Sequence, residues 1–508
     1  MPDNPLAPLA ALVASPESGN HPKAEEGSPN EYFRRKYPKV AKNRGHAFQM
    51  KYGSGGRKTV AAVSEDFLAE AIGPAGTPQA PTVFLPSEER FYQYSPGDGI
   101  YLEVSDHTLG AQLSEIIREA ALNTDPMTDV SNLQYGLCSS SQTRQILQRA
   151  RGLLAVKSFF KDGAAPELIP CKNGVLNLDS GELNPFSPEQ GFRHKLDVPY
   201  EPSAVCPTFM RVLESSMAKE DINLFQRWCG LALTGANHSQ ALMILVGTSG
   251  GGKGTCVRVL KGILGSSQMA TLRPKQLTSR FEIGRFVGRT LLYGPDVGPD
   301  FFNCDGAAVI KSLTGGDPMT VEMKNSNERP ELKCSFNVIV TANARLSVKI
   351  EGDQDAWRRR LRIIHFTGPP PTAPIHNLSE LILAREGSGV LNWMLQGLVQ
   401  LKQADWQLEQ TAAQKSAVDD MLSESTSDLL FVKDVLYTEA QKSLTHRDCY
   451  SQYQNYCSGK HWNGLSQKAF GSRIDTLVSN IFGVPARNDI RDHQGRQQRG
   501  WKGIACKS

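Results

Sequence analysis

The chain has 508 residues, of which 40% are hydrophobic and 21% charged, and its formal net charge is +4. This length accommodates two to four domains with hydrophobic cores of their own. No apolar run approaches the roughly 20 residues of a membrane span. The N-terminus lacks the basic start of a signal peptide. The ten cysteines form no C-x-x-C pair, which favours reduced thiols over a disulfide framework. We therefore expect a soluble protein of a bacterial or host cytoplasm, without membrane contact.

The first 165 residues are predicted to hold a tail and one domain. Residues 1–31 are rich in Pro, Ala, Ser and Glu, which is typical of a disordered tail. Residues 32–165 form a mixed N-terminal domain without an assigned role, in which periodicity predicts helices at 109–122 and 141–160. No convincing acid-pair motif of a nucleotidyl transferase occurs in this domain.

The N-terminal domain begins with a basic and aromatic segment. Residues 32–58 carry nine Lys/Arg and no acid, interleaved with five Tyr and Phe residues. Such a segment could bind single-stranded nucleic acid, with bases stacked on the tyrosines and cations along the phosphates. Equally, its aromatic side chains could form the core of a small domain with a basic exterior. The sequence leaves both interpretations open.

The residue pattern changes at residue 241, from turn-rich sequence to a continuous apolar run. Residues 166–240 are turn-rich with short strands and end in a helix, and we expect them to form a lead-in module. Then "ALMILVG" predicts a buried strand, "GTSGGGKGT" a glycine loop, and residues 255–265 an amphipathic helix. Strand, glycine loop and helix in this order are the context that a phosphate-binding loop requires.

The glycine loop is the strongest candidate site. Glycines let successive backbone N–H groups surround an anion, a lysine reaches the terminal phosphates, and the helix N-terminus adds positive charge. Gly254 stands where the usual pattern has a hydroxyl for Mg²⁺, and Thr255 supplies one a residue later. A flexible turn is the alternative. The predicted ligands of a nucleoside triphosphate, or of another phosphorylated molecule, are Gly247, Thr248, Ser249, Gly250, Gly251, Gly252, Lys253, Gly254 and Thr255.

Two further apolar runs, 290–297 and 334–343, predict central strands of a parallel sheet because they are almost continuously apolar. Asp296 stands at the end of the first run and could hold Mg²⁺ through water, as a Walker B acid does. Asn343 ends the second and could orient the attacking water or sense the γ phosphate. Each residue could instead belong to an ordinary turn, or in the case of Asn343 to a helix cap.

An arginine cluster follows in "DQDAWRRRLRIIHF", residues 353–366. Four arginines in so short a segment are commonly a solvated basic face. In a ring-forming ATPase, an arginine presented across a subunit interface stabilises the charge of the transition state.

Taken in order, these elements resemble a superfamily 3 helicase core, in detail that of the poxvirus and phage/plasmid primase-helicases. The stretches "LTGGDPMTVEMK" and "FNVIVTAN" are similar to the B′ and C motifs of that family, and "KNGVLNLDSGELNPFSPE" with "WCGLALTG" is similar to the module before its core. The resemblance covers residues 166–366 and, more loosely, the C-terminal unit. It does not extend into the first 150 residues.

The resemblance implies an AAA+-like α/β P-loop ATPase core, residues 241–367, with ATP and Mg²⁺ as cofactors. Lys253 would contact phosphate, Thr255 and Asp296 would serve Mg²⁺, Asn343 would be the polar sensor, and Arg359 or Arg360 the arginine finger. Lys324 would lie on a hairpin that grips DNA in the pore of a hexameric ring, with Lys311 as a further contributor. Gly254 and the missing acid pair beside Asp296 depart from the family pattern.

After a proline-rich break, residues 368–427 are predicted to form a helical extension, and residues 428–508 resemble the winged-helix domain common at the C-terminus of this family. In that domain Arg496 and Arg499 would lie on or beside the wing and contact duplex DNA; a generic basic surface is the alternative. A zinc site at His446, Cys449, Cys457 and His461 is disfavoured because its spacing fits no familiar finger.

The function that follows is an ATP-dependent DNA helicase for replication initiation, encoded by a virus, phage, plasmid or integrated element. It would translocate on single-stranded DNA as a homo-hexamer, with a separate primase or polymerase as a potential partner. The alternatives are an origin-binding initiator whose ATPase drives only assembly, and a P-loop ATPase that remodels DNA complexes without processive unwinding.

Overall fold

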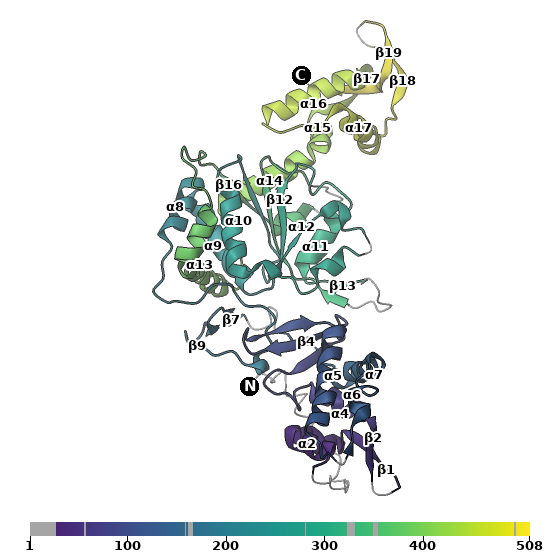
Figure 1. Ribbon diagram of the computed structural model, residues 1–508. Helices are drawn as coiled ribbons and strands as arrows, with labels where there is room; N and C mark the ends of the chain where they lie inside the picture. The colour runs from purple at the N-terminus through teal and green to yellow at the C-terminus, as the bar shows by residue number, and fades with distance from the viewer. Residues whose placement is uncertain are drawn as a thin grey trace.

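A computed structural model describes residues 27–54, 57–126, 128–157, 159–160, 166–279, 281–322, 331–348, 354–491 and 494–507 of the chain. Three bodies follow one another along an elongated molecule in the order of the sequence (Figure 1). The N-terminal body is drawn in purple and blue, the central body in teal and green, and the C-terminal body in yellow-green.

The N-terminal body combines two three-stranded sheets with helices. One sheet has the order β1-β2-β6 and the other is the antiparallel meander β3-β4-β5. Its elements in chain order are α2 (Pro29–Lys36), α3 (Pro38–Arg44), β1 (Phe48–Tyr52), β2 (Lys58–Val63), α4 (Glu65–Ala71), β3 (Thr82–Leu85), β4 (Arg90–Ser95), β5 (Ile100–Val104), α5 (Asp106–Leu122), β6 (Thr128–Asp129), α6 (Ser131–Gln134) and α7 (Ser140–Leu153).

Helix α2 begins within the range 1–31 that composition predicts to be a disordered tail. The Ser28 hydroxyl caps the helix by accepting a hydrogen bond from the backbone N–H of Glu31, and Pro29 occupies the first turn, where its missing N–H costs nothing. The side chain of Asn30 exchanges two hydrogen bonds with the backbone of Phe48 on β1. The boundary near residue 32 is therefore corrected to Pro29, while residues 1–26 of the predicted tail lie outside the described residues.

The aromatic residues of the basic N-terminal segment mostly pack inward. Phe33, Tyr37 and Phe48 are buried in one core with the helices α4, α5 and α7. Tyr52, by contrast, is 64% exposed on β1. Of the two open interpretations, core packing holds for these three buried side chains, which are therefore unavailable for stacking with bases.

The predicted helix at 109–122 corresponds to α5, which starts three residues earlier behind the Ser105 cap. The predicted helix at 141–160 is too long, because α7 ends at Leu153. Just after this point the backbone of Phe84 on β3 pairs with residues 154–156. Its N–H donates to the Leu154 carbonyl oxygen, and its carbonyl oxygen accepts from the N–H of Val156. Sheet pairing with a distant strand thus ends the helix, and local periodicity could not predict this.

The central body is built on a five-stranded sheet of order β11-β12-β15-β10-β16, in which each pair of neighbouring strands is parallel. The predicted strands at 241–247, 290–297 and 334–343 are β10, β12 and β15, and they lie side by side. The sheet elements are β10 (Leu242–Gly247), β11 (Met269–Thr271), β12 (Leu291–Val297), β15 (Asn337–Ala342) and β16 (Leu361–Phe366).

Helices cover the faces of this sheet. The segments 166–240 and 368–427 share one hydrophobic core with the sheet, in which Phe209, Trp228 and Leu391 pack with Ile339 and Ile364. These segments are thus integral parts of the central body. The remaining elements of the body are β7 (Leu168–Cys171), β8 (Gly174–Asn177), β9 (Leu183–Asn184), α8 (Pro207–Ser216), α9 (Lys219–Leu233), α10 (Lys253–Leu264), α11 (Ala307–Gly315), β13 (Pro318–Thr320), β14 (Glu331–Lys333), α12 (Gln354–Arg360), α13 (Leu378–Gln403) and α14 (Ala412–Ser425).

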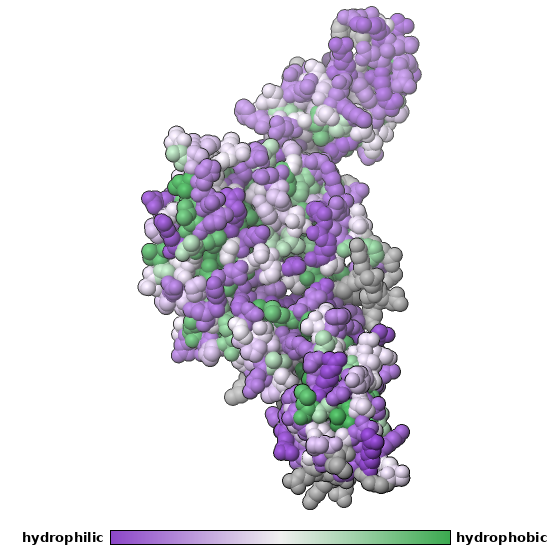
Figure 2. All heavy atoms as spheres, in the orientation of Figure 1, coloured by the Kyte–Doolittle hydropathy of each residue, from purple (hydrophilic) through white to green (hydrophobic). Residues whose placement is uncertain are grey.

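The C-terminal body packs three helices against the antiparallel sheet β17-β19-β18. Its buried Asp428 carboxylate on α15 pairs with Arg473 on α17 at 2.9 Å. On the face shown in Figure 2, hydrophilic side chains cover the end that carries the sheet. The elements are α15 (Ser427–Val435), β17 (Leu436–Thr445), α16 (His446–Gly459), α17 (Gln467–Phe482), β18 (Arg487–Arg491) and β19 (Gln497–Cys506).

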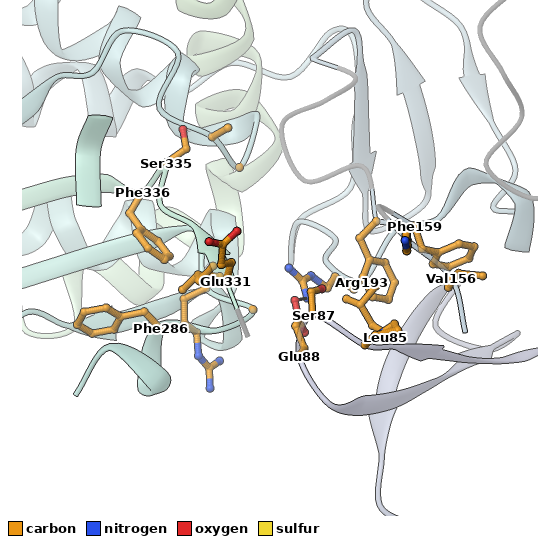
Figure 3. Close-up of a pocket in the computed structure, with 18 of the residues that line it drawn as sticks. Leu85, Ser87, Glu88, Val156, Phe159, Arg193, Phe286, Glu331, Ser335 and Phe336 are labelled. Atoms are coloured by element: carbon orange, nitrogen blue, oxygen red, sulfur yellow. Dashed lines mark hydrogen bonds and ion pairs between the residues drawn. The ribbon is translucent and has the colours of Figure 1, made fainter. Parts of the chain in front are cut away.

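A cleft of about 660 Å³ lies between the N-terminal and central bodies. Figure 3 shows its two banks, with Glu88 and Arg193 on one side and Phe286, Glu331 and Phe336 on the other. Arg193 pairs with Glu88 at 2.6 Å and so ties the segment after β9 to the N-terminal body. Within the described ranges, no helix has both the length and the apolar character that crossing a membrane demands.

Candidate functional site

The glycine loop lies at the carboxyl edge of the central sheet. Strand β10 ends at Gly247 between its neighbours β15 and β16, and α10 begins at Lys253. Ligands of open α/β sheets bind in this position, beyond the carboxyl ends of the strands. The loop also leads directly into a helix N-terminus, where unpaired backbone N–H groups favour an anion.

The loop requires glycine at several positions. Gly250 and Gly252 have backbone φ angles of +80° and +96°, which residues other than glycine adopt only with conformational strain. A Cβ atom on Gly252 would lie 2.7 Å from the Ser216 hydroxyl, and one on Gly247 only 2.3 Å from the Phe366 carbonyl oxygen. The glycines thus let the loop turn tightly against the end of α8 and against β16.

Lys253 points back into the loop. Its ammonium donates hydrogen bonds to the carbonyl oxygens of Gly247 (2.5 Å) and Thr248 (2.8 Å), and to Oδ1 of Asn343 (3.1 Å). The residue is only 4% exposed. Burial lowers the pKa of Lys253, while the charge of Asp296 opposes this shift. Three sequence-predicted residues therefore act on one another here: Lys253 and Asn343 by contact, and Asp296 through its charge.

Asp296 is the last residue but one of β12, and its backbone is bent out of the regular strand. The pairing of β12 with β15 shifts between Gly294 and Val297, and Asp296 has a φ of +39°. Its N–H donates to the Thr341 hydroxyl at 2.8 Å. A bulge of this kind re-aims a side chain, and the residue is exposed at the carboxyl edge of the sheet. Asp300, four residues further along the chain, is held in an ion pair with Lys275 at 3.0 Å.

Thr255 and Gly254 lie in the first turn of α10. The half-buried Thr255 hydroxyl accepts a hydrogen bond from Arg258 at 3.4 Å. A Cβ atom on Gly254 would meet only the flexible end of Arg258, at 3.2 Å. The hydroxyl that the sequence pattern lacks at 254 is thus available one residue later, on the same turn of the helix.

The arginine cluster lies at the opposite edge of the sheet. Because Gly247 is level with Phe366 in the parallel register, Arg360 at the amino end of β16 is roughly 20 Å from the level of the loop. Arg360 is 7% exposed and donates to the Ala356 carbonyl, whereas Arg359 is exposed. Arg358 pairs with Asp355 and Asp419.

Arg359 opens onto a pocket of about 500 Å³ that is also lined by Arg358, Arg362 and Trp406. Arg362 donates to the Leu408 carbonyl at 2.9 Å. Burial, with a smaller effect of Arg227, lowers the pKa of Arg362 to about 10. Of the two arginines that the resemblance favours as fingers, only Arg359 is accessible from outside.

The predicted DNA-binding residues are distributed over two bodies. Lys324 lies outside the described residues, between the antiparallel strands β13 and β14. Lys311 on α11 stands 6.0 Å from the centre of the Trp357 ring. In the C-terminal body Arg496 is exposed, and Arg499 forms an ion pair with Asp475 at 2.8 Å.

The residues of the disfavoured zinc site have other surroundings. His446 contacts Asp475 at 2.7 Å, and Cys449 and Cys457 are buried in the C-terminal core. Over the ranges described above, no three His, Cys, Asp or Glu side chains gather in an arrangement that could hold a metal ion.

Sequence reasoning missed the residues that support the loop. Thr341 holds the backbone of Asp296, while Ser216 and Phe366 close the space behind the glycines. They come from three segments distant in sequence, and a hydroxyl or aromatic residue at these places carries no motif. The parallel pairing of β12 with β15, had it been assumed, would have brought Thr341 beside Asp296.

Comparisons with known proteins find two family matches, one before the glycine loop and one that contains it. Residues 89–217 match a family described as "D5 N terminal like", and residues 245–360 match a family of unknown function, DUF5906. The first match supports a relationship to phage and viral primase-helicases. It also corrects the extent of the resemblance, which reaches well into the first 150 residues.

Solved structures of the NrS-1 C-terminal region are similar to this chain at low identity. One apo structure has 13% identity and a TM-score of 0.46, covering 84% of this chain and 96% of that chain. An A-form apo structure has 14% identity and a TM-score of 0.45, covering 82% and 91%.

Proposed function

We propose that this chain is an ATP-dependent DNA helicase that acts in the replication of a virus, phage, plasmid or integrated element. The observation that carries the proposal is the contact of Lys253, at the end of the glycine loop, with Asn343, which directly follows the neighbouring strand β15. Glycine loop, buried lysine and strand-end amide meet at the edge of the sheet where nucleotides bind in α/β proteins. The D5 N-terminal-like match favours DNA replication among the processes that such a site could drive.

The residues at the loop fit ATP with Mg²⁺. All three oxygens around the Lys253 ammonium are uncharged, so a phosphate group would supply the counter-charge that this buried cation lacks in its direct contacts. The Thr255 hydroxyl and the Asp296 carboxylate are oxygen ligands of the kind that Mg²⁺ prefers. Bound Mg²⁺ would neutralise charge on the phosphates, and the loop would hold them in place.

The position of Arg359 supports a ring. At roughly 20 Å along β16 it is too far from the loop of its own chain to stabilise charge there. An exposed arginine at the opposite edge can serve only the nucleotide of another copy, and head-to-tail contacts of this kind close into rings. We therefore propose a homo-hexamer with Arg359 as the finger.

Contacts to DNA are proposed at two places. The segment between β13 and β14, which contains Lys324 in the sequence, would grip single-stranded DNA in the pore of the ring. The C-terminal body, with three helices and the sheet β17-β19-β18, would act as a winged helix in which Arg496 contacts duplex phosphates. Arg499 already pairs with Asp475 and would need to exchange that partner for DNA.

The test uses the full chain in assays of ATP hydrolysis and of strand displacement on a forked duplex. Lys253→Ala should reduce both activities by roughly 10²-fold or more, because it removes a preorganised cation from the phosphate site. The matched control is Lys261→Ala on the exposed side of the same helix, which should leave both unchanged. Displacement by Lys253→Ala at the wild-type rate would refute the proposal.

A second measurement separates unwinding from the alternatives. Lys324→Ala should retain ATP hydrolysis and lose strand displacement. If the wild-type chain hydrolyses ATP in response to DNA and displaces no strand, the protein is an origin-binding initiator or a DNA-remodelling ATPase.

A further inference from the structure

The end of the N-terminal body that is farthest from the central body concentrates positive charge. Residues 28–63 contain nine Lys/Arg and a single acid, Glu31. They form α2, α3, β1 and β2, which lie at the lower end of the molecule in Figure 1. The glycine loop lies in the central body, so this charge belongs to a different part of the molecule.

Four of the nine basic side chains are engaged by acids of the same body. These ion pairs are Arg35 with Glu31, Lys36 with Glu119, Arg44 with Glu70 and Asp66, and Arg57 with Asp129. Arg35 and Glu31 lie on the same helix, whereas the other pairs join α2 to α5, α3 to α4 and the segment before β2 to β6.

Of the other five basic side chains, Lys58 has an interaction of its own, and four are left over. Arg34, Lys39, Lys42 and Lys51 are exposed, and none forms an ion pair with any residue that the structure describes. Lys39 and Lys42 stand three residues apart on α3 and therefore share one face of that helix. We call these four residues the distal basic surface.

The elements beneath the distal basic surface are packed against one another. The ring of Phe33 on α2 packs edge-on against that of Phe48 on β1, with centroids 4.9 Å apart. The Asn30 side chain joins the same two elements by hydrogen bonds of 2.8 Å. The four cations are thus spread over two helices and a strand whose relative positions are fixed by a packed core.

We propose that the distal basic surface binds the phosphate backbone of nucleic acid, independently of the nucleotide site. Cations on long stems spread over one packed surface suit an extended polyanion, and such contacts carry no sequence information. Phe33, Tyr37 and Phe48 are buried and cannot stack on bases, so the proposal rests on the cations and not on the exposed Tyr52. The choice of nucleic acid among anionic partners rests on the proposed function.

The test compares two full-length triple variants by their affinity for single-stranded and duplex oligonucleotides over a range of salt, without ATP. The first is Arg34→Gln/Lys39→Gln/Lys42→Gln. The control is Arg385→Gln/Lys219→Gln/Lys261→Gln, which removes one arginine and two lysines from exposed positions of the central body. Thermal unfolding of both variants checks that the chain remains folded.

The first variant should bind roughly 10- to 100-fold more weakly near 0.1 M salt, with a salt slope reduced by about two units, since each phosphate contact contributes nearly one unit on duplex and somewhat less on a single strand. Lys51→Gln, on the strand, should reduce the slope by less than one unit. The form of DNA that loses more affinity identifies the strand that is bound.

Equal salt slopes for the first variant and the control would overturn the proposal. So would binding to vesicles of anionic phospholipid that depends on these residues while DNA binding does not. The two hypotheses fail separately: loss of this surface leaves DNA-independent ATP hydrolysis at the wild-type rate, and Lys253→Ala leaves the salt slope in the absence of ATP unchanged.

Discussion

At the scale of single residues, the sequence motifs pointed to Lys253 and Asn343 but not to the residues that hold the loop and its surroundings in place. Lys253 and Asn343 are ninety positions apart, yet the rule that ligands meet strand ends predicts that they lie together, and their side chains are 3.1 Å apart. The bent backbone at Asp296 was not predictable, because it depends on the hydroxyl of Thr341 on a neighbouring strand. A sequence motif indicates which residue types are suited to bind a ligand. The backbone conformation that positions them depends on tertiary contacts, which the motif does not contain.

The proposed role of the Thr255 hydroxyl at Mg²⁺ gives a prediction at this scale. Thr255→Ala should lower ATP hydrolysis at least about tenfold and raise the Mg²⁺ concentration needed, because it removes the nearest hydroxyl in the helix turn after Lys253. Gly254→Ser should be tolerated, since its Cβ meets only the flexible end of Arg258. In the double variant Gly254→Ser/Thr255→Ala, the serine stands where the usual pattern has its hydroxyl and should restore part of the activity.

The measurement is hydrolysis against Mg²⁺ concentration, with Thr271→Ala on β11 as an exposed control. A Thr255→Ala protein with the wild-type Mg²⁺ dependence would show that Thr255 does not serve the metal.

At the scale of elements, the predictions hold best where one local signal dominates. The continuous apolar runs locate β10, β12 and β15 within a few residues, because central parallel strands are buried on both faces. The end of α7 was misplaced, since pairing with Phe84 stops a helix whose periodicity continues. The burial of Phe33 and Tyr37 could not be decided either, because the same residues suit a core and a stacking surface.

The crossing of α9 and α13 yields a prediction at this scale. A Cβ atom on Gly230 would lie 2.3 Å from the backbone nitrogen of Leu398, and one on Gly397 would lie 2.2 Å from the Gln226 carbonyl oxygen. The two helices thus approach through their glycines. Gly230→Ala should therefore force them apart and destabilise the central body by about 1–3 kcal/mol, seen as a lower temperature of thermal unfolding.

The matched control is Gly471→Ala in α17, where nothing lies within 4 Å of the added Cβ. This change should stabilise its helix by about 0.5–1 kcal/mol through helix propensity alone. Equal effects of the two substitutions would mean that the contact between α9 and α13 does not depend on Gly230.

At the scale of the whole molecule, the small net charge of +4 does not show how the exposed basic residues are distributed over the surface. Exposed basic residues gather on the distal basic surface and on β18 and β19 of the C-terminal body, at the two ends of the molecule, with the glycine loop between them (Figure 1). Composition could not predict this, because it depends on how three bodies follow one another in space. The same holds for Arg359, whose distance from the loop follows only from the register of β16 with β10.

The separation of Arg359 from the loop gives a prediction about assembly. Arg359→Ala should retain ATP binding and lose hydrolysis by about 10³-fold or more. Arg358→Ala should have a small effect, because the native Arg358 guanidinium is already paired with Asp355 and Asp419.

Lys253→Ala should be inactive for the opposite reason, because its loop is damaged and its Arg359 is intact. Co-expressed in equal amounts, the two inactive chains should complement one another, since about one quarter of the interfaces in a randomly mixed ring join an intact loop to an intact Arg359. Hydrolysis near a quarter of the wild-type rate is expected, provided that the interfaces act independently. A mixture as inactive as either chain alone would exclude action of Arg359 across an interface, because complementation requires that the two edges of the sheet meet between copies.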